Sequence, residues 1–142
     1  MEEHHPESLT ANPVEIARIL KDYRVIAIVG LSDKPDRPSY QVASYLKEHG
    51  YRIVPVNPGR QEILGEKCYK TLRDIPFPVE VVNIFRQVEA IPAIVEAAIS
   101  QGAKVIWMQL GLESPSAARR AIESGLQVIM NRCIKIEHGK TQ

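Results

Sequence analysis

The sequence has no long hydrophobic run and little charge imbalance, and each absence excludes a class of protein. Nothing in its 142 residues approaches the roughly 18 consecutive apolar residues of a membrane-spanning helix. The formal net charge is +1, so no strong overall field would attract nucleic acid or an anionic membrane. The N-terminal stretch MEEHHPESLT is acidic and polar, unlike a secretory signal. With only two cysteines, Cys68 and Cys133, no disulfide framework forms, and we expect a cytoplasmic protein.

Catalytic and metal-binding motifs are also missing. The sequence contains no HExxH, no CxxC and no complete G-x-x-x-x-G-K-[ST] motif of a P-loop. His4 and His5 stand together without a carboxylate or cysteine at ligand spacing, so we predict no metal site. We expect Cys68 to be a buried or half-buried packing residue rather than a nucleophile. Cys133 follows Arg132, and a neighbouring cation favours the reactive thiolate, although packing explains this residue equally well. The sequence therefore favours a protein without a complete catalytic site.

The chain does contain a regular alternation of apolar strands and amphipathic helices. The expected strands are 24–29, 52–56, 79–85, 104–108 and 126–130, and the expected helices are 13–22, 38–49, 88–101 and 115–124. Asn12, Pro13 and Glu15 form a capping signal for the first helix. Continuous apolar strands are typical of a parallel sheet that is covered on both faces.

We therefore predict the α/β class. Residues 12–142 should form a single Rossmann-type domain with a parallel five-stranded sheet and helices on both faces. Numbered along the chain, the strands are expected in the order 3-2-1-4-5. Residues 1–11 are expected to form a flexible tail.

The stretch from Arg24 to Ser39 combines a strand, a glycine turn at Gly30 and a helix start at Pro38. Such a turn lies at the carboxyl edge of a parallel sheet, where ligands bind, and free N–H groups at the helix start suit a phosphate. Further cations follow the strand ends: Lys34, Arg37, Arg60, Arg86 and Arg132. Acidic residues share these loops, so the cations alone favour an anion site only modestly.

The dinucleotide fingerprint G-x-G-x-x-G is incomplete. Gly30 fills its first position, but Ser32 and Pro35 replace the other two glycines. Asn57 follows the second strand, where NAD-binding proteins place an acid for the ribose. These departures argue against NAD. NADP remains an alternative, because Arg60 would suit a 2′-phosphate.

Six segments at the predicted strand ends carry a family resemblance: VIAIVGLSDKPDRPSYQVASYLKEHGY, YRIVPVNPG, LGEKCY, VEVVNIFR, VIWMQLG and VIMNRC. With them the chain resembles the small stand-alone CoA-binding proteins. These are related to the N-terminal CoA-binding domain of the succinyl-CoA synthetase alpha subunit. The resemblance covers roughly residues 23–138.

This resemblance implies that coenzyme A lies across the carboxyl edge of the sheet. The phosphate portion would be held by Gly30, Leu31, Ser32, Lys34, Arg37, Pro38 and Ser39. The adenine nucleotide would be flanked by Val56, Asn57 and Pro58, with Arg60 where the synthetase has a lysine. Phe85 and Arg86 would also line the site. The pantetheine arm would lie near Gln109, Gly111, Asn131, Arg132 and Cys133.

The chain also departs from the synthetase. Leu-Ser-Asp-Lys-Pro replaces the glycine-rich loop, and the phosphohistidine domain and the beta subunit are absent. We therefore expect a protein that binds CoA or a short acyl-CoA in a non-catalytic, accessory or sensing role. Two alternatives are another nucleotide such as NADP, or an enzyme that uses Cys133 on the CoA thiol or an acyl-CoA. A homo-oligomer or a protein partner is compatible with the sequence, whereas no nucleic acid or membrane is expected.

Overall fold

The computed structural model describes residues 9–142, in which strands and helices alternate along the chain. Its strands are β1 (Val25–Val29), β2 (Arg52–Val56), β3 (Glu62–Ile63), β4 (Glu66–Lys67), β5 (Val81–Ile84), β6 (Val105–Met108) and β7 (Gln127–Ile129). Its helices are α2 (Pro13–Asp22), α3 (Pro38–Glu48), α4 (Ile91–Ser100), α5 (Pro115–Glu123) and α6 (Ile134–Gly139), with short 3₁₀ turns η1 (Leu72–Asp74) and η2 (Val88–Ala90). None of the helices in the described range is long and apolar enough to cross a membrane.

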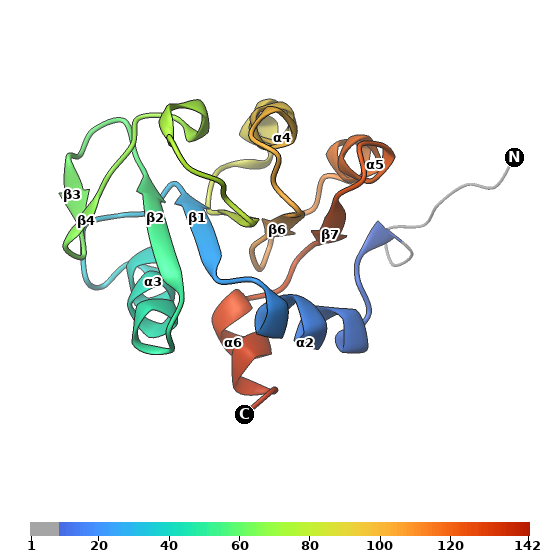
Figure 1. Ribbon diagram of the computed structural model, residues 1–142, viewed down its shortest axis with the longest axis horizontal. Coiled ribbons are helices and arrows are strands. Elements are labelled where there is room, and N and C mark those ends of the chain that lie inside the picture. Colours follow the sequence, from blue (N-terminus) through green and yellow to red (C-terminus); the bar gives the residue numbers. More distant parts are fainter. Residues whose placement is uncertain (1–8) are drawn as a thin grey trace, which may run out of the picture.

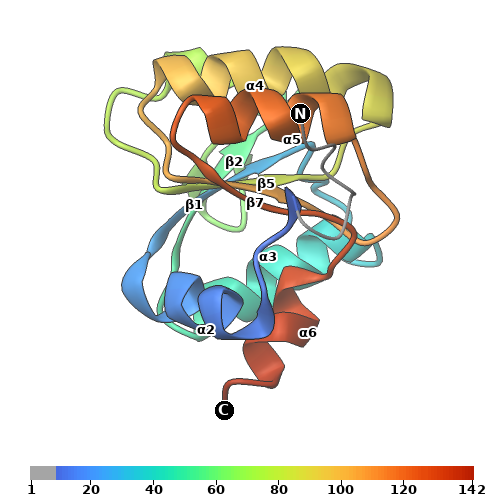
Figure 2. The ribbon, with the colours of Figure 1, turned by 90° about the vertical axis from the view of Figure 1, so that its right-hand side faces the viewer.

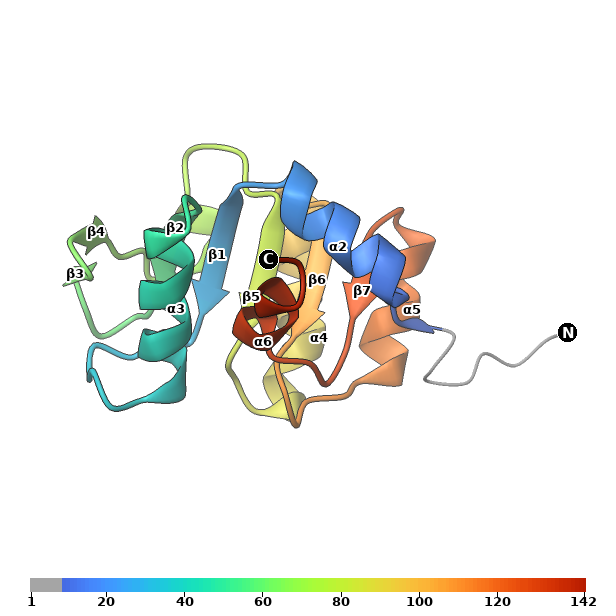
Figure 3. The ribbon, with the colours of Figure 1, turned by 90° about the horizontal axis from the view of Figure 1, so that it is seen from below.

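Helices cover both faces of the parallel sheet, which confirms the predicted fold class (Figures 1 and 2). Helices α4 and α5 lie on one face, and α2, α3 and α6 lie on the other (Figures 2 and 3). Two buried apolar clusters fill the two interfaces, one around Ile84 and Val95, the other around Ile28 and Trp107. The strands are buried along nearly their whole length, as continuous apolar runs require.

The predicted strand order is wrong. The sheet runs β2-β1-β5-β6-β7, which is 2-1-3-4-5 for these five strands, so β2 lies at an edge. The outer side of β2 is occupied by Tyr69, whose amide donates to the carbonyl of Pro55 and whose carbonyl accepts from Asn57. Pro55 has no N–H to donate, and a proline within a strand is characteristic of an edge strand. Pro55 was therefore the feature of the sequence that argued against a central position for the second strand.

The corrected order also moves the topological switch point. From β1 the chain passes to β2 on one side, whereas from β5 it continues to β6 and β7 on the other side. The crevice for a ligand therefore opens between β1 and β5, rather than between β1 and the fourth strand, β6, as the sequence prediction implied.

The structure adds elements that periodicity did not reveal. Helix α6 packs beside α2 and α3, and a small antiparallel hairpin, β3–β4, follows β2. The capping box of Asn12 and Glu15 at the start of α2 is confirmed. The predicted tail falls mainly outside the described residues. Its last part is packed: Leu9 is buried, and the Ala11 amide donates to Val128 O at 2.7 Å.

Candidate functional site at the carboxyl edge

The strand register aligns the residues that follow the strands. Val29 pairs with Val56 and with Ile84, and Ile84 pairs with Met108, so these four strands end level with one another. The loops expected to hold the ligand therefore leave from one edge. Adjacent strands lie about 4.8 Å apart, so five of them present an edge of roughly 19 Å. This length suits an extended ligand rather than a compact one.

At the switch point the loops after β1 and β5 touch through Gly30. A Cβ atom on Gly30 would lie 2.5 Å from the Phe85 carbonyl oxygen and 2.9 Å from Arg86 Cδ. Gly30 also has φ +90°, in the left-handed region that favours glycine. The Phe85 amide donates to Val29 O at 2.8 Å, which holds the two loops together. The turn therefore requires glycine for both conformation and space.

The loop after Gly30 is anchored from within. The Leu31 side chain is fully buried, so it contributes to packing rather than to a ligand surface. The Ser32 amide donates to Ser39 Oγ at 3.0 Å, and the Lys34 amide donates to Ser32 Oγ at 3.1 Å. Arg37 is the N-cap of α3 and makes no side-chain capping bond. The first turn of α3 thus keeps backbone donors available for an anion.

This corner forms a shallow pocket of about 320 Å³. Its lining is drawn almost entirely from the predicted site: Gly30, Ser32, Lys34, Arg37, Pro38, Ser39 and Phe85. Lys34, Arg37 and the neighbouring Arg86 are exposed, and within residues 9–142 none of the three forms an ion pair. An exposed cation without a carboxylate partner is free to meet a phosphate.

Arg60 differs from the other predicted cations. Its Nε donates to Asp33 Oδ2 at 2.7 Å, and its Nη1 donates to Gly59 O at 2.9 Å. Asp33 belongs to the loop after β1, so this pair ties the first two ligand-side loops together. Both side chains are about half exposed, and such a pair contributes about 1 kcal/mol or less.

Asn57 joins the same two loops. Its Nδ2 donates to Leu31 O at 2.9 Å, and its Oδ1 accepts from the Gly59 amide at 2.8 Å. Cys68 lies below it, buried, and its thiol donates to Asn57 O at 3.4 Å. Burial raises the pKa of the Cys68 thiol, as expected for a packing residue. Of the predicted adenine-flanking residues, Val56 is buried and Pro58 is exposed.

Asn83 is a site-supporting residue that the sequence analysis missed. It is fully buried in β5, where its Nδ2 donates to Gln109 Oε1 at 3.2 Å and to Trp107 O at 3.4 Å. Gln109 Oε1 also accepts from the Ile134 amide at 3.4 Å. Asn83 Nδ2 and the Ile134 amide are both donors, so the Gln109 atom that faces them must be the oxygen. This fixes the orientation of the Gln109 side-chain amide. Asn83 Oδ1 has no partner within residues 9–142. The sequence did contain a signal for Asn83, because it is a polar residue inside an otherwise apolar strand, VVNI.

The remaining predicted residues lie farther along the edge. Asn131 has φ +58°, and its Oδ1 accepts from the Gly111 amide at 2.6 Å. Arg132 approaches Glu137 at 3.6 Å, and Cys133 is half-buried at the start of α6.

A second hollow of about 580 Å³ opens at this end of the edge. It is lined by Thr10, Ala11, Asn12, Pro13, Glu113, Met130, Asn131 and Arg132. Seven of the predicted residues thus line the hollow at the β1–β5 switch point, and only Asn131 and Arg132 line the one beyond β7. Residues 10–13 were missed because they were assigned to the tail or to a helix start.

Comparisons with known proteins identify the family of the chain. The model of a family described as a CoA binding domain matches residues 24–139. The chain belongs to the CoA-binding domain family. It is 42% identical over 128 residues to an uncharacterized protein, YneT of Bacillus subtilis, covering 90% of this chain and 95% of that one.

The family also occurs inside much larger proteins. Over 81 residues the chain is 31% identical to an ADP-forming acetate–CoA ligase II of Archaeoglobus fulgidus, covering 56% of this chain but only 12% of the ligase. A solved structure of a hypothetical protein from Pyrococcus horikoshii superposes with a TM-score of 0.90 at 42% identity, and covers 99% of each chain. The expected kinship with synthetase-type CoA-binding domains and with small stand-alone proteins is thereby confirmed.

Proposed function

We propose that the protein binds coenzyme A, or a short acyl-CoA, along the carboxyl edge of its sheet, and that it does so without catalysing a reaction. The observation that carries this proposal is the pocket at the β1–β5 switch point, within a chain that belongs to the CoA-binding domain family. Backbone N–H groups at the start of α3 and the side chains of Lys34, Arg37 and Arg86 contact the phosphates. The pantetheine arm extends past Gln109 towards the second hollow.

The non-catalytic role follows from the sequence prediction, in which no complete catalytic motif was recognised. The protein would then carry CoA or report on its presence, in the cytoplasm and through a partner protein or a second copy. A pull-down with and without CoA tests this role, and an unchanged set of partners counts against it.

Thermal-shift measurements with four ligands test the proposal. A ligand that binds only the folded state stabilises it by about 2.7 kcal/mol at 100 times its dissociation constant. CoA or acetyl-CoA should therefore raise the melting temperature by roughly 10 °C at that concentration, and NAD should not. Stabilisation by NADP but not by CoA would contradict the proposal. A preference between CoA and acetyl-CoA would identify the thiol end as part of the recognised group.

Cys133 offers a separate test of the enzymatic alternative. Its thiol stands at the start of α6, two residues after Asn131. If it exchanges with an oxidised, disulfide form of CoA, intact mass should show one CoA adduct with the release of one CoA thiol. The Cys133→Ser variant should lose that adduct. Absence of the adduct in the unaltered protein removes this role.

A further inference from the structure

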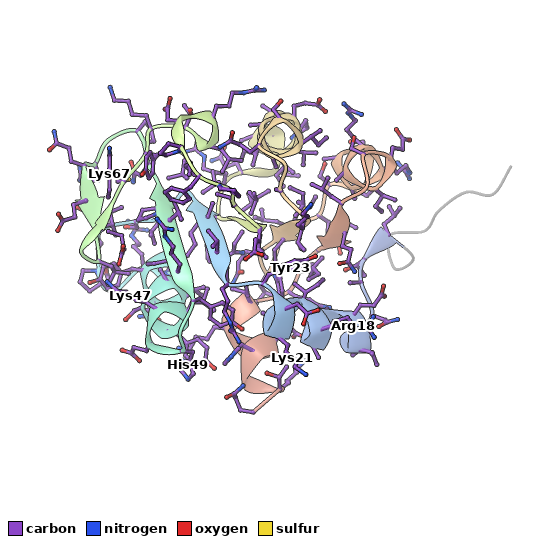
Figure 4. The ribbon with its side chains drawn as sticks, viewed as in Figure 1. Arg18, Lys21, Tyr23, Lys47, His49 and Lys67 are labelled. Atoms are coloured by element: carbon purple, nitrogen blue, oxygen red, sulfur yellow. The ribbon has the colours of Figure 1, made fainter. Side chains whose placement is uncertain are left out.

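A third hollow, of about 410 Å³, lies at the opposite end of the sheet. It opens where α2, α3 and α6 end, beside the starts of β1 and β2. Its lining includes Lys21, Arg24, His49, Tyr51, His138 and Thr141. Figure 4 shows Lys21 on α2 and His49 after α3 on either side of α6. We call this space the amino-edge pocket.

The amino-edge pocket is basic. Four of its lining residues, Lys21, Arg24, His49 and His138, are of basic types, and none of its lining residues within 9–142 has a carboxylate side chain. Within residues 9–142 none of the four forms an ion pair. Two basic side chains that share a concave space, with no carboxylate side chain in its described lining, are suited to an anion.

Three helices end here, and cations are often found near helix ends because the exposed carbonyl groups carry partial negative charge. In this pocket, however, neutral groups already satisfy several of those carbonyls. The Tyr51 hydroxyl donates to Leu20 O, the Tyr23 amide to Ile19 O, and Thr141 Oγ1 to His138 O at 2.7 Å. No hydrogen bond to these carbonyls comes from Lys21 or Arg24. The two cations are therefore available to a ligand.

Aromatic residues hold the basic groups in position. The Arg24 guanidinium lies 4.8 Å from the centre of the Tyr51 ring. His138 Nδ1 is 2.8 Å from Tyr45 Oη, and His49 Nδ1 donates to Tyr45 O at 2.7 Å. The two imidazole rings are 5.1 Å apart, centre to centre. This arrangement reduces the conformational freedom that binding would otherwise have to restrict.

We infer that the amino-edge pocket is a second binding site, for a phosphate group on a small molecule. Lys21 and Arg24 contact the phosphate oxygens, and His138 adds positive charge when it is protonated. This inference does not rest on CoA binding, because the pocket lies at the other end of the sheet from the residues proposed for CoA.

Protonation of His138 should strengthen the binding of a phosphate dianion. The groups that face His138 are His49 and Tyr45 of the α3 segment, Tyr51 at the start of β2, and Arg24 before β1. Burial, followed by the charges of His49 and Arg24, lowers the pKa of His138. A bound phosphate opposes the effect of those positive charges and raises this pKa, so by linkage protonated His138 favours phosphate.

Nuclear magnetic resonance of the imidazole protons tests the inference, with inorganic phosphate as the probe and ionic strength held constant with sodium chloride. Phosphate should shift the His49 and His138 signals in a saturable manner and raise the pKa of His138. Arg24→Gln should weaken this phosphate response at least tenfold, and Lys21→Gln, at an exposed position, at least threefold. Arg37→Gln, at the opposite edge of the sheet, should leave it unchanged.

Three results would overturn the inference. One is a shift that does not saturate, and another is an equal response to chloride alone. The third is an unchanged response in the Lys21→Gln variant, whose folding does not depend on the contact between Arg24 and Tyr51. A failure of CoA binding, by contrast, would leave all of these expected results in place.

Discussion

The two ends of the sheet both carry a hollow with basic residues in its lining, but they are built from different parts of the chain. At the carboxyl edge, the strand-end loops and the uncapped first turn of α3 supply backbone N–H groups, and exposed cations surround them. At the amino edge, helices end and present carbonyl oxygens rather than N–H groups, so side chains have to bind an anion. Recognition by backbone groups depends on local chain geometry, whereas recognition by side chains depends on charge and pH. Substitutions should separate the two ends accordingly.

The largest difference is expected between two glycines with nearly the same backbone angle. Gly30 has φ +90° and Gly50 has φ +88°, but only at Gly30 would a Cβ atom meet other atoms within 4 Å. Gly50→Ala should cost about 1 kcal/mol of backbone strain. Gly30→Ala should cost about 4 kcal/mol, because overpacking against Phe85 adds to the strain. Urea denaturation measures both values, and equal losses would show that the β1 and β5 loops do not approach as closely as described.

A charge placed in the buried network behind the carboxyl edge should have the next largest effect. In Asn83→Asp the carboxyl group would face two acceptors, Trp107 O and Gln109 Oε1, so it must be protonated to donate. Its pKa should be raised above the unfolded value of about 3.9. The variant is therefore expected to lose about 2–3 kcal/mol at pH 8 and less at pH 5. A loss that does not depend on pH would contradict the assigned orientation of the two amides.

Removal of one exposed cation at the carboxyl edge should weaken CoA binding about tenfold, or about 1.4 kcal/mol, without a change in stability. Arg37→Gln is the test, because Arg37 caps α3 without a side-chain bond. Lys67→Gln is the control, since it removes the same charge from the small hairpin. Calorimetric titration with CoA measures both variants, and equal affinities would mean that Arg37 does not contact the phosphates.

The smallest expected effect is on the pH dependence of stability, and it comes from His138 at the amino edge. Burial and nearby positive charge lower the pKa of His138 in the folded protein, whereas the unfolded chain has a histidine pKa of about 6.5. The unfolded state therefore binds more protons as the pH falls through this range, and stability decreases below about pH 7. The melting temperature should fall by a few degrees between pH 7 and pH 5. His138→Gln should flatten this dependence, and an unchanged pH profile would exclude His138 as its source.

The sequence was sufficient for the parts of the fold that are determined by local pattern. Continuous apolar runs identified the five parallel strands, and Asn12 with Glu15 identified the start of α2. The strand order was mispredicted because it is decided by what covers an edge, here Tyr69 on the outer side of β2. Helix α6 was missed because its six residues are too few to show a periodicity.

The loops that form the candidate site could be predicted from the sequence, but the contacts between their residues could not. The strand ends identified Gly30 and Arg37, and the family resemblance added Phe85; the structure brings all three to one pocket. Spacing could not show that Arg60 would be paired with Asp33, because that contact joins loops 27 residues apart. The amino-edge pocket was not predicted at all. Its residues come from segments that meet only when α6 folds back against α2 and α3.

Hydrogen exchange measured with and without CoA tests the central claim most directly, because it reports on both ends of the sheet in one experiment. CoA should slow amide exchange in the loop and first turn of α3, residues 30–41, and after β5, residues 85–88. Exchange in residues 21–24 and 49–51 should be unchanged. Slowed exchange confined to these amino-edge segments, with residues 30–41 unaffected, would contradict the assignment of CoA to the carboxyl edge.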